Sequence, residues 1–166
     1  MKRTAVIDRR YRGLQIIEAE PQDVESVLPL FLGYLEFYKR PGSSTKARKF
    51  LRERLKRGES KIFLALLDGE PAGFVQLYPT FASIAMKPAW VLYDLFVLPA
   101  ARKKGVAHAL VKRAQKLGAD TGAAELVLET ATTNRAAQHL YNKLGWTRDS
   151  GFLLYRYYYR QKKVAD

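Results

Sequence analysis

The sequence contains no cysteine and only two histidines, His108 and His139. The absence of cysteine excludes disulfide bonds, thiolate catalysis and cysteine-based zinc sites, and it fits a reducing compartment. A metal site would need carboxylates beside the histidines, and none lies at ligand spacing from either one. We therefore expect no metal ion in this protein.

Long hydrophobic runs are also missing. No segment approaches the roughly 20 apolar residues needed to cross a bilayer, and the basic amino terminus meets Asp8 and Arg9 before an apolar run of signal-peptide length develops. No linker or repeat interrupts the 166 residues, a length typical of one domain. We expect a soluble, cytoplasmic protein without a membrane partner, with a flexible basic segment over residues 1–13 and a single domain over residues 14–166.

Acidic residues are few, because 16 Asp and Glu stand against 29 Lys and Arg, which gives a formal net charge of +13. The basic side chains are locally concentrated: residues 102–116 contain six of them and no acidic one. Such an excess serves solubility in general, but it also suits an anionic cofactor or a nucleic acid. The local concentration favours the cofactor.

Hydrophobic periodicity and turn residues predict alternating elements. The expected helices begin at Pro21, Ser43, Val106 and Asn134, and the expected strands cover 14–18, 61–67, 72–78, 90–98, 126–130, 146–148 and 152–159. Pro79 should end its strand or mark a bulge, and residues 81–88 should form a loop. The Asp68-Gly69 pair should form a tight turn between the strands at 61–67 and 72–78, and Ser43 or Ser44 should cap the second helix. The helix that begins at Val106 should bury Val106, Leu110, Ala114 and Leu117 and direct Lys112, Arg113 and Lys116 toward solvent. A helix between the strands at 90–98 and 126–130 makes that pair parallel, whereas the hairpins are antiparallel. A mixed α/β sheet is therefore expected.

The most informative segment follows the strand at 90–98, where a basic loop with Gly105 opens a helix. Such a loop presents backbone N–H groups at a helix amino terminus, where unpaired donors and the macrodipole favour a diphosphate. The sequence contains neither G-x-x-x-x-G-K-[ST] nor a G-x-G-x-x-G after a strand. A P-loop nucleotidase or a Rossmann dehydrogenase is therefore not expected.

The string Arg-x-x-Gly-x-Ala, from Arg102 to Ala107, resembles the coenzyme A pyrophosphate loop of the GNAT superfamily of N-acetyltransferases. A second motif strengthens the resemblance, because residues 134–145 follow the Asn-x-x-Ala-x-x-x-Tyr-x-x-x-Gly pattern of the family's cofactor helix. Seven residues return a helix to almost the same face while advancing roughly 10 Å. Asn134 and Tyr141 can therefore line up along one extended ligand.

The resemblance covers about residues 14–159 and implies the GNAT fold: a mixed, mostly antiparallel sheet with a central pair of splayed parallel strands and helices on both faces. It implies acetyl-CoA as the cosubstrate. The residues that it assigns to the cofactor are Phe96, Val97, Arg102, Lys103, Lys104, Gly105, Val106, Ala107, Asn134, Ala137 and Tyr141. Main-chain groups of Phe96 and Val97 would bind the pantetheine amides, and a bulge of the strand there would supply an oxyanion donor.

The implied reaction is direct transfer of an acetyl group, within a ternary complex, to the primary amine of a small molecule, an amino acid, a peptide or a protein. Tyr141 is the candidate general acid, because a phenol with a pKa near 10 holds its proton at neutral pH and can release it to the departing thiolate. The general base is open. Asp94 is the candidate, but Glu129 also lies near the end of a parallel strand, and either could equally be a structural carboxylate. A water chain or Tyr78 could also relay the proton in place of a carboxylate. The candidate acceptor residues are Tyr34, Tyr38, Tyr78 and Glu129.

Two alternatives stay open. The basic segments and the aromatic stretch 155–159 also suit a nucleic-acid- or ribosome-associated binding module. Tyr93 stands where several amine-acetylating relatives carry an acidic residue, which leaves a non-catalytic acyl-CoA sensor as the second alternative. The aromatic stretch reads more simply as a final strand, in a protein that is a monomer or a homodimer.

Overall fold

The computed structural model describes residues 6–7 and 11–159. In this part of the chain one six-stranded sheet has the order β1-β2-β3-β4-β5-β6. All neighbouring strands are antiparallel except β5 and β6, which are parallel. The strands are β1 (Val6–Ile7), β2 (Leu14–Glu18), β3 (Lys61–Leu67), β4 (Glu70–Ala82), β5 (Lys87–Val97) and β6 (Leu126–Leu128). Strand β1 lies in the amino-terminal segment where no element was predicted.

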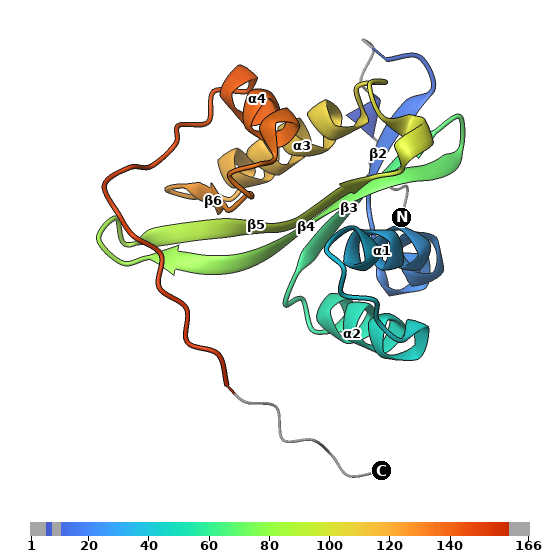
Figure 1. Ribbon diagram of the computed structural model, residues 1–166, viewed down its shortest axis with the longest axis horizontal. Coiled ribbons are helices and arrows are strands. Elements are labelled where there is room, and N and C mark those ends of the chain that lie inside the picture. Colours follow the sequence, from blue (N-terminus) through green and yellow to red (C-terminus); the bar gives the residue numbers. More distant parts are fainter. Residues whose placement is uncertain (1–5, 8–10, 160–166) are drawn as a thin grey trace.

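Helices cover both faces of the sheet (Figure 1). α1 (Val24–Phe37) and α2 (Ser44–Lys56) lie on one face, and α3 (Val106–Asp120) and α4 (Arg135–Lys143) lie on the other. The predicted mixed α/β sheet between two helical layers is thereby confirmed. Across residues 6–7 and 11–159, no helix is long and apolar enough to span a membrane.

Local sequence signals account for several element boundaries. Ser43 caps α2, since its hydroxyl accepts a hydrogen bond from the Lys46 N–H. Asp68 and Gly69, which join β3 to β4, have φ angles of 53° and 89°. Two consecutive left-handed residues are what a two-residue hairpin turn requires, so the turn predicted from the Asp-Gly pair is confirmed.

The hairpin of β4 and β5 is longer than predicted. β4 continues through Pro79 to Ala82, and the segment expected to be a loop over 81–88 instead contains the ends of both strands around a tight turn. Pro79 does not end the strand because the pairing of β3 with β4 stops at Leu77. Beyond that point β4 pairs with β5 alone, and a strand with one free side tolerates a proline.

Strand β5 carries a bulge at Tyr93. Gln76 of β4 lies opposite Asp94, and the next residue of β4 lies opposite Leu92, so Tyr93 is the extra residue. The bulge expected at Phe96 and Val97 was therefore placed about three residues too late. Its actual position directs the Asp94 side chain into the layer of α1 and α2.

The parallel strands β5 and β6 pair only from Trp90 opposite Leu126 to Leu92 opposite Leu128. β5 then continues to Val97 without a strand beside it on this side in the described part of the chain. β6 itself ends at Leu128, so the pairing stops there and the second half of β5 is left with a free side. The parallel pair β5 and β6 is present as predicted, but it lies at the edge of the described sheet and not at its centre.

The pair lies at the edge because the carboxy-terminal segment adds no further strand to the sheet. The prediction of a terminal hairpin in this segment is wrong. Residues 146–159 form no strand. Trp146 still packs against Tyr141, and the segment after it extends away from the body of the protein (Figure 1). The large apolar side chains of that segment are at least 60% exposed: Phe152, Leu153, Leu154, Tyr155, Tyr157, Tyr158 and Tyr159. A segment of strand-like composition forms a strand only where the edge of another strand pairs with it and other residues bury its side chains. Both conditions depend on the tertiary structure.

The sheet separates two hydrophobic cores. In the core beneath α3, the predicted stripe of that helix is buried: Val106, Leu110, Ala114 and Leu117. Arg113 was expected on the solvent side, but its guanidinium carbon lies 3.9 Å from the centre of the Phe63 ring. In the second core, Gly33 of α1 makes room for Phe96, because a Cβ at Gly33 would lie 2.9 Å from that ring.

Candidate active site

Asp94 is the buried carboxylate of the site. It follows the bulge in β5, and 5% of the residue is exposed. Burial raises the pKa of Asp94 to about 6, and a hydrogen bond from Tyr34 partly opposes this rise. The carboxylate is consequently ionised at pH 7. Its pKa is nevertheless near enough to 7 for the carboxylate to take up a proton during a reaction, as a general base does.

Tyrosines from α1 and β4 surround this carboxylate. Burial, and after it the charge of Asp94, raises the pKa of both Tyr34 and Tyr78. Tyr34 packs edge-on against Tyr38 with ring centres 5.0 Å apart, and Tyr78 packs edge-on against Tyr93 at 5.6 Å. Of the three tyrosines predicted for the acceptor site, Tyr34 and Tyr78 interact electrostatically with Asp94, and Tyr38 contacts the ring of Tyr34.

A pocket of about 430 Å³ opens beside these tyrosines. Its lining residues are Phe50, Arg54, Tyr78, Val91 and Tyr93. Phe50 and Arg54 are one turn apart on α2, and the Arg54 guanidinium lies 5.4 Å from the centre of the Phe50 ring. Sequence reasoning missed both residues, although their i, i+4 spacing places them on one helix face.

The polar character of the site extends across β4, at a position that sequence reasoning also missed. Gln76 lies opposite Asp94 in the sheet register and is fully buried. Its Nε2 donates a hydrogen bond of 2.9 Å to the hydroxyl of Ser60, which is buried as well. Cross-strand neighbours have adjacent side chains, so Asp94 has a polar neighbour on the core side.

The burial of Asp94 makes the stability of the fold depend on pH. Because the pKa of about 6 in the folded state exceeds the ordinary value of 3.8, the native state binds a proton more tightly than the unfolded chain. The resulting stabilisation is complete below pH 3.8 and is lost as the pH rises through 6. A separation of about two pH units corresponds to about 3 kcal/mol.

We therefore expect the free energy of unfolding of the wild type to fall between pH 4 and pH 7 by up to about 3 kcal/mol more than that of Asp94→Asn. The asparagine has no proton to lose, while all other titrating groups are common to both proteins. Urea unfolding at several pH values measures the difference. Parallel pH profiles for the two proteins would contradict the raised pKa of Asp94.

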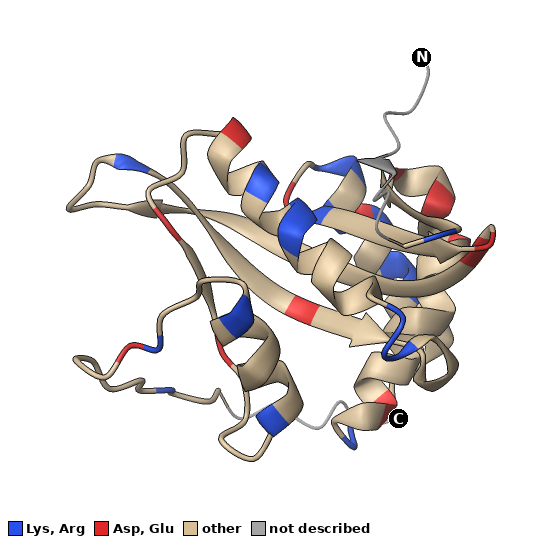
Figure 2. Ribbon diagram, turned by 90° about the horizontal axis from the view of Figure 1, so that it is seen from above, with Lys and Arg blue, Asp and Glu red and all other residues tan. Residues whose placement is uncertain are grey.

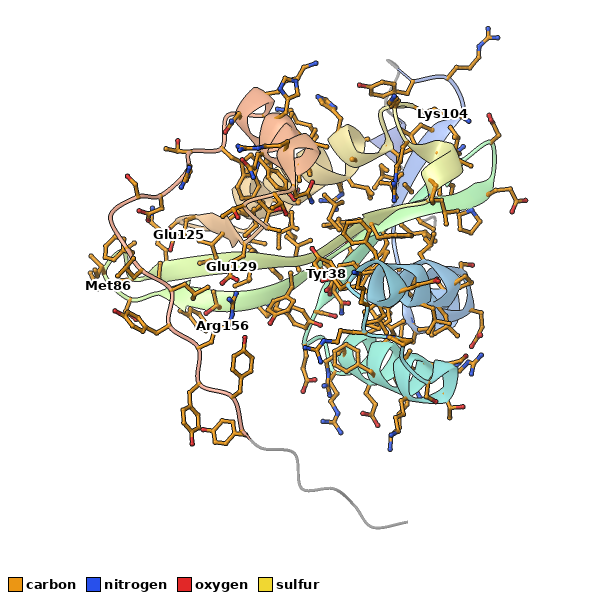
Figure 3. All side chains as sticks on the ribbon, in the orientation of Figure 1. Tyr38, Met86, Lys104, Glu125, Glu129 and Arg156 are labelled. Atoms are coloured by element: carbon orange, nitrogen blue, oxygen red, sulfur yellow. The ribbon has the colours of Figure 1, made fainter. Side chains whose placement is uncertain are left out.

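Tyr141 lies on α4, in the other helical layer, and 8% of it is exposed. Its ring packs against Trp146 with centres 5.8 Å apart. Burial, and to a lesser extent Tyr38, raises the pKa of Tyr141 to about 12. The phenol therefore holds its proton throughout the neutral range. Tyr38 follows the last residue of α1 and is labelled in Figure 3. It interacts electrostatically with Tyr141 of α4 and with Tyr34, which in turn is hydrogen-bonded to Asp94, so both predicted catalytic residues have neighbours in one tyrosine group.

The free half of β5 offers main-chain groups to the open edge of the sheet. The Phe96 carbonyl faces Gly73 of β4, and the Leu98 N–H donates to Ala72 of β4. Because successive residues of a strand direct their main-chain groups to alternate sides, Val97 faces the open edge. Phe96 was expected to bind the pantetheine through its main chain, but its carbonyl is directed toward β4, and its side chain fills the core under α1.

The predicted diphosphate loop connects β5 to α3. Gly105 is the amino-terminal cap of α3 with a left-handed φ of 82°, and Lys103 is also left-handed with a φ of 61°. Lys103 and Lys104 are exposed, while Arg102 donates a hydrogen bond of 3.3 Å from Nε to the Val97 carbonyl. Figure 2 shows Lys and Arg on this loop and along α3, and Lys104 is labelled in Figure 3. After the loop, the chain enters α3 with Val106 buried and Ala107 half-buried.

The remaining predicted residues occupy two different settings. Asn134 caps α4, because its Oδ1 accepts a hydrogen bond of 3.2 Å from the Ala137 N–H. Glu129, predicted for the acceptor site, is exposed beyond β6 and forms an ion pair with Arg156 of the carboxy-terminal segment (Figure 3). Its ion-pair partner Arg156 therefore lies outside the tyrosine group around Asp94.

The sequence and the fold of the chain are similar to those of known acetyltransferases. The model of the acetyltransferase (GNAT) family matches residues 27–146. The uncharacterized N-acetyltransferase YhfO of Bacillus subtilis (strain 168) is 42% identical over 86% of this chain and 95% of its own length. The crystal structure of a probable acetyltransferase is 36% identical, with a TM-score of 0.83 over 89% of this chain and 99% of that one. An aminoglycoside N-acetyltransferase solved in complex with CoA shares the fold at 22% identity, with a TM-score of 0.73 over 92% of this chain and 99% of that one.

Proposed function

Because the chain belongs to the acetyltransferase (GNAT) family, we propose that it transfers an acetyl group from acetyl-CoA directly to the primary amine of an acceptor. The observation that carries this proposal is the free edge of β5 beyond Leu92, where its pairing with β6 ends, with a basic loop at the end of β5 and the buried Asp94 beside this edge. An extended thioester cofactor fits such an arrangement. Its arm needs main-chain hydrogen-bonding groups, and its diphosphate needs backbone N–H groups with positively charged side chains close by.

The cofactor would lie along the free half of β5. Val97 would bind a pantetheine amide through its main chain, as an added strand does. The diphosphate would lie at the N–H groups of residues 103–107, at the positive end of the α3 dipole, with Lys103 and Lys104 close by. The fold that this chain shares with a CoA-bound acetyltransferase supports this placement.

The reaction would begin with proton transfer from the bound ammonium to Asp94. The neutral amine nitrogen then attacks the thioester carbonyl carbon, so that a C–N bond forms and the C–S bond breaks. A main-chain N–H at the free edge of β5 would stabilise the oxyanion that develops between these events. Tyr141 would give its proton to the departing thiolate, which leaves as the neutral thiol. The nitrogen of the adduct would give up its second proton to the Tyr141 phenolate, directly or through water, which yields the neutral amide and restores the phenol. Asp94 would then release the first proton to solvent, so that one proton is released per turnover.

The pocket favours an acceptor with one positive charge and an apolar body. Its walls are largely aromatic, and Asp94 provides a single buried carboxylate next to them. Aromatic faces attract an ammonium group through their quadrupoles, whereas Arg54 and the other basic residues of α2 repel a second cationic centre. We therefore expect apolar or aromatic monoamines to be better acceptors than polyamines.

A thiol-release assay tests the proposed function and the acceptor class together. The purified protein is incubated with acetyl-CoA and a panel of monoamines, amino acids, peptides, aminoglycosides and polyamines, and free CoA thiol is measured. Release above hydrolysis, with acetylated monoamine identified by mass spectrometry, is the expected result. Absence of release with every amine, in a protein that binds acetyl-CoA, would support a non-catalytic acyl-CoA sensor instead.

Acetyl-CoA is also expected to stabilise the fold. At a concentration 100 times its dissociation constant, a ligand that binds only the native state adds about 2.7 kcal/mol to the free energy of unfolding. Thermal unfolding with and without ligand measures this as a rise in Tm. No rise at millimolar acetyl-CoA would reject the cofactor site.

A further inference from the structure

We propose that Tyr11, in the segment before β2, is a positioning residue that holds the diphosphate loop in its binding shape. This inference rests on the proposed function, because it concerns the loop that would bind the cofactor. Tyr11 lies about ninety residues from the loop in sequence and belongs to neither of the two motifs described above. Only the fold brings it to Gly105.

Gly105 has no side chain, and the ring of Tyr11 closely approaches its backbone. A Cβ built on this glycine would lie 2.2, 2.3 and 2.4 Å from three atoms of the Tyr11 ring. The ring therefore rests directly against the backbone of the loop. Two features require glycine at position 105: the left-handed φ of 82° and the close approach of this ring. Tyr11 occupies the space that the glycine leaves open. From the sequence, Gly105 was instead expected to let the backbone come close to the diphosphate.

Tyr11 also contacts the helix that the loop opens. Its ring lies edge-on to His108, with ring centres 6.1 Å apart and an angle of 62° between the planes. Positions 105 and 108 are three residues apart and share one face of the first turn of α3. A single side chain thus braces the cap and the first turn together, and it packs onto the core beneath α3.

Tyr11 is itself anchored to the sheet. Its carbonyl accepts a hydrogen bond of 3.2 Å from the Leu14 N–H, which closes a turn into β2. Gly13 in this turn accepts a hydrogen bond of 2.9 Å from the Asp68 N–H, at the hairpin between β3 and β4. A Cβ on Gly13 would lie 2.0 Å from the Asp68 carboxylate, so the turn and the hairpin are in direct contact. The backbone of Tyr11 is therefore held in place by its contacts with β2 and with the β3–β4 hairpin.

The loop needs such a brace because its conformation is not one that its residues favour. Lys103 is a non-glycine residue in the left-handed region, which such a residue occupies only when its surroundings impose it. On one side of the loop, Arg102 is tied to the Val97 carbonyl. On the other side, Tyr11 covers Gly105. If the brace is removed, the binding conformation becomes one of several, and the apparent affinity falls in proportion to its population.

The test compares Tyr11→Ala, Tyr11→Phe and the wild type with two cosubstrates. Acetyl-CoA carries the diphosphate, and S-acetylpantetheine lacks it. We expect Tyr11→Ala to raise the KM for acetyl-CoA, and the Kd for CoA from calorimetry, about tenfold, the equivalent of about 1.4 kcal/mol. The kcat at saturation and the KM for S-acetylpantetheine should stay within about twofold of the wild type, because neither involves the loop. Tyr11→Phe keeps the ring and should restore both constants for the CoA ligands.

One control variant and one substitute variant sharpen the outcome. Phe81→Ala removes an aromatic ring that is 81% exposed at the tip of the β4–β5 hairpin, and it should leave every constant unchanged. If Tyr11→Ala fails to fold, Tyr11→Leu, which retains apolar bulk without a ring, replaces it with the same expectation. Unchanged affinity for CoA, or equal losses with both cosubstrates, would overturn the role of Tyr11. A wild type that neither binds CoA nor transfers acetyl groups would instead overturn the proposed function itself.

Discussion

Replacement of Asp94 by asparagine is expected to lower kcat/KM by about 10²- to 10⁴-fold, the range that general acid or base catalysis contributes. The amide has the size of the carboxylate and can still accept the hydrogen bond from Tyr34, so the site keeps its shape. It cannot take the proton of the ammonium, and the acceptor remains unreactive. Initial rates at subsaturating acceptor measure the loss.

The pH profile identifies the cause of this loss. The pKa of Asp94 is about 6, and only the ionised form accepts a proton, so kcat/KM of the wild type should rise with pH through about 6 and then level off. Asp94→Asn should lack this rise. Tyr34→Phe should move it to higher pH, because the hydrogen bond from Tyr34 lowers the pKa of Asp94. An unchanged profile in Asp94→Asn, or activity within a few-fold of the wild type, would assign the base to another group.

The second large effect is expected for Tyr141→Phe, which should lower kcat by about 10²-fold and leave the KM for acetyl-CoA nearly unchanged. Phenylalanine fills the same place against Trp146 and Leu144, but it has no proton for the thiolate. With the pKa of Tyr141 at about 12, the wild-type phenol is protonated at every pH at which the enzyme would work.

Cosubstrates with different leaving groups provide the decisive comparison for Tyr141. An acetyl thioester of a more acidic thiol expels a stable thiolate that needs no proton, so Tyr141→Phe should lose less activity with it than with a pantetheine thioester. Tyr158→Phe, a change in a side chain that is 78% exposed, should leave both rates unaltered. Equal losses with both leaving groups would show that Tyr141 acts through packing and not through its proton.

The features that could be predicted from the sequence are those set by neighbouring residues. The Asp68-Gly69 turn, the Ser43 cap and the buried stripe of α3 each depend on residues within one or two turns of the chain, and the structure confirms all three. The loop that we propose for the diphosphate could be selected for the same reason, since its glycine cap and its basic residues are contiguous.

The features that were missed depend on contacts between distant segments. Nothing near Tyr93 indicates a bulge there, because a bulge is a mismatch of register with β4. Pro79 was judged by its own strand, yet the end of β3 decides whether a proline is tolerated. Tyr11 and Arg54 gain their neighbours only when the turn before β2 meets the loop and α2 meets the sheet.

The unpaired half of β5 has an evolutionary consequence. Its contribution to ligand binding would come from peptide groups, which every residue except proline carries, so amino-acid replacements along it can accumulate without removing the donors. A shared architecture at 22% identity accords with such freedom. Selection would then fall most heavily on the few positions whose side chains do the chemistry or hold the backbone in shape, and acceptor preference could diversify on a scaffold that stays the same.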